Sequence, residues 1–199
     1  MREPNARRRS GPGRRRAQAL LPICLLLTAC ASGGHNYHDR KMDFAAIKTV
    51  AVLPLANLSR DTMAGDRVRE VFANLLLASG SLYVLPQGEV ARGVTRAGVT
   101  NPMAPSKDEV IALGKALGAE AVISGTLKEY GEVRSGTSAA NVVSLNLELF
   151  ETATGVVVWS GSSTKGGIGL SERLFGGGGA PMNAVTEEAC RDLLDKLFK

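Results

Sequence analysis

The alternating segment over residues 143–149 constrains the fold of this chain most strongly. Val and Leu occupy every second position, and Ser, Asn and Glu lie between them. A period of two with polar partners predicts a half-buried antiparallel strand. The sequence TATG then provides a turn whose glycine can adopt a positive φ, and VVVWS over residues 156–160 predicts the returning strand.

Three further strands are expected upstream of this hairpin. Residues 49–55, TVAVLPL, form a near-continuous apolar run, which is typical of a strand covered on both faces. Residues 82–86 and 121–130 have the composition of two more strands. Together with the hairpin, these segments predict a mixed sheet of five strands.

Helices are expected between and after these strands. Apolar residues recur at three- and four-residue steps over residues 68–76, and a weaker helical pattern covers residues 89–96. SKDE contains a capping box, formed by Ser106 and Glu109, that begins a third helix. A last helix is expected over residues 183–198. The predicted order is βαβααβββα, one α+β domain over residues 46–199 with its helices packed on the sheet.

The first 29 residues have the pattern of a removable leader. Seven arginines precede an apolar segment over residues 17–27, which small residues close. A charged start, a short apolar core and small residues near its end are typical of a signal peptide. About 11 apolar residues are too few to cross a bilayer, which needs roughly 20.

The basic character of the chain belongs to this leader. Seven of the 24 Lys and Arg and one of the 19 Asp and Glu precede Cys30, so 17 basic and 18 acidic residues remain, a formal net charge of −1. This balance argues against nucleic-acid binding, which needs clustered basic side chains. Cys30 and Cys190 are the cysteines left after cleavage, and Cys190 is expected to be a buried apolar residue.

The four residues that end at Cys30, LTAC, resemble a bacterial lipobox. The resemblance implies that Cys30 receives diacylglycerol, becomes the first residue of the mature chain and is then N-acylated. Several acyl chains anchor a protein stably, whereas one binds only marginally. Ala31 follows where an aspartate would retain an enterobacterial lipoprotein at the inner membrane, so the resemblance favours the outer membrane.

Residues 30–45 are expected to be the lipidated cysteine and a flexible polar tether. This tether contains both histidines, His35 and His38. A metal site there is not expected, because no third ligand is near and catalytic zinc is held by three protein ligands.

The folded part lacks the residues of common catalytic sites. It contains no histidine, so Ser-His-Asp and Cys-His arrangements cannot form there. It has neither a G-x-S-x-G nor an H-E-x-x-H motif, and its glycine runs lack the pattern of a nucleotide loop. We therefore expect no enzymatic activity and no cofactor other than the covalent lipid.

The segment GGIGLSERLFGGGG over residues 166–179 admits two interpretations. Half of it is glycine, which favours a floppy surface loop. Alternatively, the loop becomes ordered against a partner protein or a second copy and contributes Leu170, Leu174 and Phe175. Replacing Leu174 and Phe175 with Ser would then abolish co-purification of the partner.

Three segments together resemble one group of lipoproteins. They are VAVLPLANLS, LGAEAVISGTL and LELFETATGVVVWS. They are similar to the curli-secretion channel (CsgG-type) and the penicillin-binding-protein activator (LpoB-type), whose fold resembles the N-terminal domain of TolB. The resemblance implies an outer-membrane lipoprotein that faces the periplasm and binds other proteins, with a homo-oligomer as an option.

Two functions follow from this resemblance. The favoured one is a non-enzymatic adaptor in envelope assembly or export. The alternative is a subunit of a secretion channel or oligomeric transport complex. The curli-type channel inserts two long amphipathic hairpins at positions that correspond here to residues 128–142 and 162–182. Neither region supplies a pair of strands with the alternation that membrane strands need, which argues against a pore.

Overall fold

The predicted hairpin is present at the centre of the sheet. The computed structural model describes residues 36–136, 138–168 and 179–199, which fall within one compact unit. Strand β6 (Ser138–Glu151) and strand β7 (Val156–Gly166) pair antiparallel, from Val142 opposite Gly166 to Glu151 opposite Val156. Gly155 in the turn has a φ of +68°, as the sequence predicts. A side chain there would also meet the backbone oxygen of Lys107, since an added Cβ would lie 2.6 Å from it.

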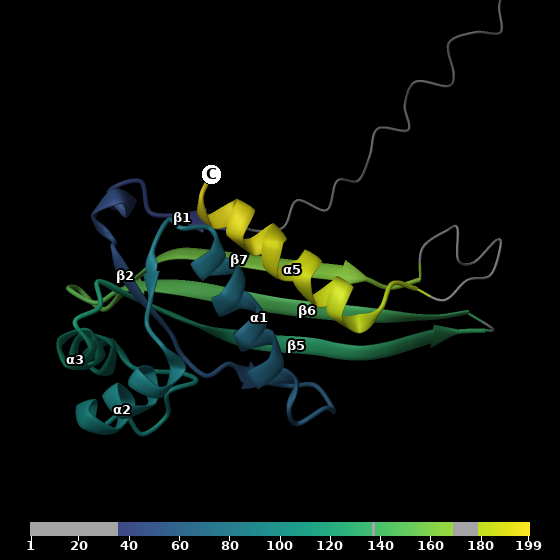
Figure 1. Cartoon of the computed structure of the whole chain (residues 1–199), viewed down its shortest axis with the longest axis horizontal. Helices are drawn as coiled ribbons and strands as arrows, with labels where there is room; N and C mark the ends of the chain where they lie inside the picture. The colour runs from purple at the N-terminus through teal and green to yellow at the C-terminus, as the bar shows by residue number, and fades with distance from the viewer. Residues whose placement is uncertain (1–35, 137, 169–178) are drawn as a thin grey trace, which may run out of the picture. The chain divides into compact units, whose positions relative to one another are not determined.

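The sheet is mixed and has seven strands in the described residues (Figure 1). Its order is β1-β7-β6-β5-β2-β4, and β3 pairs with β5. β2 is parallel to β4 and β5, and β3 is also parallel to β5, whereas the β1, β6 and β7 pairings are antiparallel. The remaining strands are β1 (Asn36–His38), β2 (Thr49–Val52), β3 (Ala56–Asn57), β4 (Tyr83–Val84) and β5 (Ala121–Ser135).

The prediction of five strands is wrong, and the predicted order lacks β1 and β3. β1 is a three-residue polar strand that forms only by pairing with β7, a contact about 120 residues away in sequence. β3 follows β2 after Pro54, because proline cannot donate a ladder hydrogen bond and interrupts the run. β5 and β6 also extend to Ser135 and Ser138, further than the apolar pattern indicates.

Four helices accompany the sheet in the described residues. They are α1 (Ala64–Ala78), α2 (Gln87–Ala97), α3 (Lys107–Leu117) and α5 (Met182–Leu197), and a short 3-10 turn, η1, covers Phe44–Ala46. The capping box is confirmed: Ser106 Oγ accepts from Glu109 N, and Glu109 Oε2 accepts from Ser106 N. Gly118 ends this helix with a φ of +65°.

Successive residues of β2 divide the core into two layers. Val50 and Val52 pack in a cluster with α1 and α5, whereas Ala51 and Leu53, which directly follows the strand, pack in a second cluster with α2 and α3. Because neighbouring side chains of a strand point to opposite faces, the two helix pairs cover opposite faces of the sheet. Figure 1 shows α5 running along β7 and β6, and α2 and α3 gathered at one end.

No helix in the described ranges is long and apolar enough to cross a membrane.

Candidate interaction surfaces

Most residues to which the sequence assigns a role lie outside the described part of the chain. Cys30 falls there, as do Leu170, Leu174 and Phe175 of the glycine-rich segment and His35 of the tether. The roles expected for them stay predictions. Across residues 36–136, 138–168 and 179–199, no group of three His, Cys, Asp or Glu side chains could hold a metal ion.

His38 is described, and its ring has a structural role. Its Nε2 lies 2.8 Å from the backbone oxygen of Lys196 in the last turn of α5. The ring packs against Phe44 and Trp159, with centroids 5.3 and 6.4 Å apart. A ring held in this way contributes to the fold and not to a mobile segment.

The backbone carbonyl of Lys196 also holds β1, the first described strand, in place. Asn36 Nδ2 and Trp159 Nε1 donate to the Lys196 oxygen at 3.4 and 3.3 Å. The last carbonyls of a helix have no partner within the helix, so side chains from β1 and β7 satisfy this one. The sequence assigns residues 36–45 to a flexible tether, but the structure joins them to the domain through β1 and η1.

The thiol of Cys190 is chemically inert. Its residue is fully buried in α5, as the sequence predicts. Burial, with a smaller contribution from the negative charge of Glu187, raises the pKa of Cys190 to about 12. The nucleophile is the thiolate, so this cysteine has no reactive form near neutral pH.

Arg69 of α1 is a buried cation, which the sequence pattern does not indicate. Its Nε and Nη2 donate to the backbone oxygen of Val52 at 3.0 and 2.7 Å. Burial lowers its pKa, and the nearby negative charge of Asp66 opposes that shift. Because Nε and Nη2 both donate to the last residue of β2, Arg69 connects α1 to the sheet where that strand ends. The apolar pattern over residues 68–76 places Arg69 in a helix, but it does not indicate that the side chain is buried.

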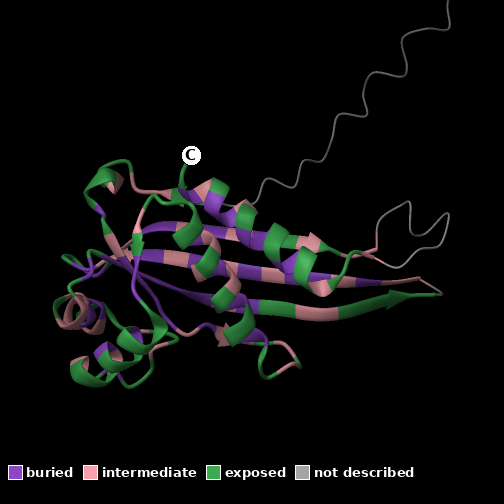
Figure 2. Cartoon of the chain, viewed as in Figure 1, coloured by how far each residue is buried: buried purple, intermediate pink, exposed green. Residues whose placement is uncertain are grey.

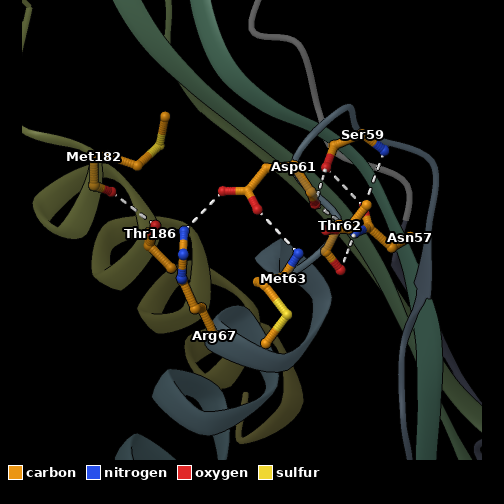
Figure 3. A network of polar contacts seen from close by, with 8 residues as sticks. All are labelled: Asn57, Ser59, Asp61, Thr62, Met63, Arg67, Met182 and Thr186. Atoms are coloured by element: carbon orange, nitrogen blue, oxygen red, sulfur yellow. Dashed lines mark hydrogen bonds and ion pairs between the residues drawn. The ribbon is translucent and has the colours of Figure 1, made fainter.

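The loop between β3 and α1 is held by a network of short polar contacts (Figure 3). Asn57 Nδ2 donates to the backbone oxygen of Asp61 at 2.7 Å, and Ser59 Oγ donates to Asn57 Oδ1 at 2.7 Å. The Asp61 carboxylate accepts from Met63 N at 2.9 Å and forms an ion pair with Arg67 at 2.7 Å. Such side-chain contacts to the local backbone fix a turn without any apolar core.

This ordered loop presents two large apolar side chains to solvent. Leu58 is 71% exposed and Met63 is 54% exposed. Exposed apolar side chains on an ordered loop are suited to protein binding, because little conformational entropy is lost when a partner docks. We call Leu58 and Met63, with the turn that holds them, the β3–α1 loop surface. The spacing of Asn57, Ser59 and Asp61 is the sequence signal that could have indicated its turn.

A second candidate surface is the polar face of the central strands. Ser144 and Thr164 lie opposite each other in β6 and β7, with their hydroxyls 2.8 Å apart. Asn146 and Glu148 continue this face, and a pocket of about 280 Å³ opens beside them. The side chains of this strand face are polar and half-exposed or exposed, so the face offers hydrogen bonds and little apolar area.

The third candidate is the outer edge of β5. Past Leu127, no strand in the described ranges pairs with this side of β5. Figure 2 shows that the far part of β5 is mostly exposed. An unpaired edge can accept another strand, but Glu129, Glu132 and Arg134 place charges along it, which opposes uncontrolled pairing.

One protein-family model matches most of this domain. The model of the GNA1162-like family, described as "Putative lipoprotein GNA1162-like", matches residues 39–198. The chain belongs to the GNA1162-like family. No curated protein sequence matches it.

Solved structures show the fold of this GNA1162-like chain. The lipoprotein GNA1162 from Neisseria meningitidis is 20% identical, with a TM-score of 0.54 over 76% of this chain and 98% of that one. The PelC dodecamer from Paraburkholderia phytofirmans is 20% identical, with a TM-score of 0.55 over 82% of this chain and 96% of that one. The LpoB C-terminal domain from Escherichia coli is 16% identical, with a TM-score of 0.47 over 63% and 87%, and carries no argument. At these identities the first two show the fold alone.

Proposed function

We propose that this chain is a lipoprotein anchored through Cys30 to the outer membrane, where it faces the periplasm and acts as a non-enzymatic adaptor that binds other proteins. The observation that carries the proposal is the match to a lipoprotein family over residues 39–198, which begins nine residues after the cysteine of the LTAC motif. A lipoprotein of this kind needs an acylated cysteine just before its folded domain, and Cys30 has that position.

Binding is favoured over catalysis by the state of the buried reactive groups. The thiol of Cys190 stays protonated, and the guanidinium of Arg69 already donates to Val52. By contrast, the β3–α1 loop surface exposes two large apolar side chains on an ordered turn. We assign protein binding to this surface, together with Leu170, Leu174 and Phe175 of the glycine-rich segment.

Co-purification from native membranes tests the adaptor function. The full-length protein with an affinity tag is compared with two double variants, Leu58→Ser with Met63→Ser and Leu174→Ser with Phe175→Ser. Tyr83→Ser is the matched control, because Tyr83 is 58% exposed but lies in β4, which follows the end of α1, whereas the β3–α1 loop surface precedes its start. We expect a protein that co-purifies with wild type and the control and is lost from at least one double variant. Recovery of the same co-purifying proteins with wild type, the control and both double variants would contradict the assignment.

A second function is favoured by one observation about a similar structure. The PelC structure that has this fold is a dodecamer. The alternative is therefore that this chain is a subunit of an oligomeric, CsgG-like export complex. Detergent-extracted protein separates the two: a discrete ring that conducts ions in planar bilayers supports the channel, whereas a non-conducting monomer or dimer excludes it.

A further inference from the structure

We propose that the β1 edge of the domain lies flat against a phospholipid bilayer, and that Tyr37 and Phe198 enter its headgroup region. This inference rests on the proposed lipid anchor at Cys30. It adds which side of the domain faces the membrane and which side is left free for a partner.

The length of chain between the anchor and the fold limits the choice of side. Six Cα-to-Cα steps separate Cys30 from Asn36, so the two Cα atoms lie at most about 20 Å apart. Asn36 is fixed in the fold, because it pairs with Gly161 and donates to the Lys196 oxygen. The membrane surface therefore lies within that distance of the β1 edge.

The remaining candidate surfaces lie away from this edge. Gly161 pairs with Leu147, and the strand that runs from there to Ser138 measures about 30 Å at roughly 3.3 Å per residue. The end of the β5–β6 hairpin is thus beyond the span of the tether. The β3–α1 loop surface lies across β7, β6 and β5 from β1, and the four strand spacings from β1 to β3 alone amount to about 19 Å.

The side chains at the β1 edge suit a bilayer interface. Tyr37 is 50% exposed and lies opposite Ser160, on the polar face of the sheet. Phe198 is 47% exposed and follows α5, which covers the other face. The carbonyl of Lys196, two residues before Phe198, accepts from Asn36 of β1. Phe198 itself lines a pocket with Leu75 and Ala78 of α1, so this ring lies at the end of α5 between β1 and α1. Aromatic side chains favour the headgroup level of a membrane.

The charged residues near the two rings in sequence are of both signs. Arg40, Lys41 and Lys199 are exposed. Asp43 and Asp195 are also exposed, and Asp39 is half-buried. The cations among them are attracted to anionic headgroups where they lie near a membrane surface. A flat apolar protein partner would leave these charges without a counterpart.

Fluorescence quenching by brominated lipid tests this orientation. The full-length protein is expressed, extracted and reconstituted into vesicles of phosphatidylethanolamine and phosphatidylglycerol, with or without bromine on the upper acyl chain. Trp159 is the single native tryptophan and is fully buried, so it provides a constant background. The variants are Tyr37→Trp and Phe198→Trp, and Leu58→Trp is the matched control at the far side. Circular dichroism confirms that each variant is folded.

We expect a blue-shifted emission and a loss of intensity with brominated lipid for Tyr37→Trp and Phe198→Trp, and no change beyond wild type for Leu58→Trp. If one of the two variants fails to fold, the other still decides. Quenching of Leu58→Trp alone, or equal quenching of all three, overturns the orientation. No quenching of either edge variant in vesicle-bound protein also overturns it and indicates that the edge is free for a protein.

The lipid anchor itself is checked separately by the intact mass of the same sample. Protein without an acyl chain contradicts the proposed function and leaves the orientation to be decided by coupling the Cys30 thiol to a maleimide lipid. A chain that begins at Cys30 is used for this coupling, because Cys24 of the leader would also react, and Cys190 does not compete, because it is fully buried.

Discussion

Two glycines of β5 show how differently single residues constrain this fold. A Cβ added at Gly125 would lie 2.2 Å from the backbone oxygen of Asn146 and 2.6 Å from a methyl of Leu147. A Cβ added at Gly131 would meet nothing within 4 Å. The first glycine is required by the close approach of β6, whereas the second lies in the exposed extension of the strand.

Gly125→Ala should therefore destabilise the domain by about 1–3 kcal/mol, since overpacking against backbone cannot relax easily. Gly131→Ala should stay within about 1 kcal/mol of wild type and tends to stabilise, because alanine loses less backbone entropy on folding. Urea unfolding followed by circular dichroism measures both. Equal stability of the two variants would contradict the assigned packing.

At the same scale, Glu109 should make the stability of the domain depend on pH. The backbone N–H of Ser106 is the main cause that holds the pKa of Glu109 below its ordinary value of 4.5, and the Ser106 hydroxyl and the Thr100 N–H act in the same direction. A lowered pKa stabilises the folded state above the ordinary value, and this stability is lost as the pH falls through the pKa of the folded state. Wild type should thus exceed Glu109→Gln in urea midpoint, and by more at about pH 7 than at about pH 4, because the carboxylate begins to be protonated below its ordinary pKa. A difference that is the same at both pH values would contradict this cause.

At the scale of the elements, Arg69 connects α1 to β2. Arg69→Met leaves the buried Val52 oxygen without its two donors, which should cost about 1–3 kcal/mol. Arg67→Met on the same helix is the control. It removes an exposed ion pair to Asp61, and such pairs contribute less than about 1 kcal/mol. Thermal unfolding measures both variants. Equal decreases in Tm for the two would contradict the role of Arg69.

The elements that could be predicted are those whose signals are local. The capping box of Ser106 and Glu109, the helix stop at Gly118 and the turn at Gly155 each depend on a few neighbouring residues, and the structure has all three. β1 could not be predicted, because its polar residues form a strand only through β7 and the Lys196 carbonyl. The extension of β5 past Tyr130 was also missed, since a strand exposed on both faces has no apolar alternation.

The candidate site was less predictable than the fold. The exposure of Leu58 and Met63 depends on how the loop from Asn57 to Arg67 is held against α1, which no periodicity reveals. The residues to which the sequence assigns lipidation or partner contact lie outside the described ranges: Cys30, Leu170, Leu174 and Phe175. Their motifs are local, but their roles depend on a membrane or a partner.

At the scale of the whole molecule, the sheet separates two tasks. The β1 edge joins the chain that leads to Cys30, and the β3–α1 loop surface and the free edge of β5 lie on the other side of the central strands. Helices α1 and α5 cover one face of the sheet. Helices α2 and α3 cover part of the opposite face, and the rest of that face is polar. The arrangement suits a domain that is held at a membrane by one edge and presents the rest to other proteins.

The most direct test of this account is the mass of the N-terminal peptide of the protein extracted from bacterial membranes. The account predicts a mature chain that starts at Cys30 with a diacylglycerol thioether and an amide-linked acyl chain, and outer-membrane fractionation that the Cys30→Ser variant loses. A mature terminus at another residue, or an unmodified Cys30 thiol in membrane-bound protein, would contradict it.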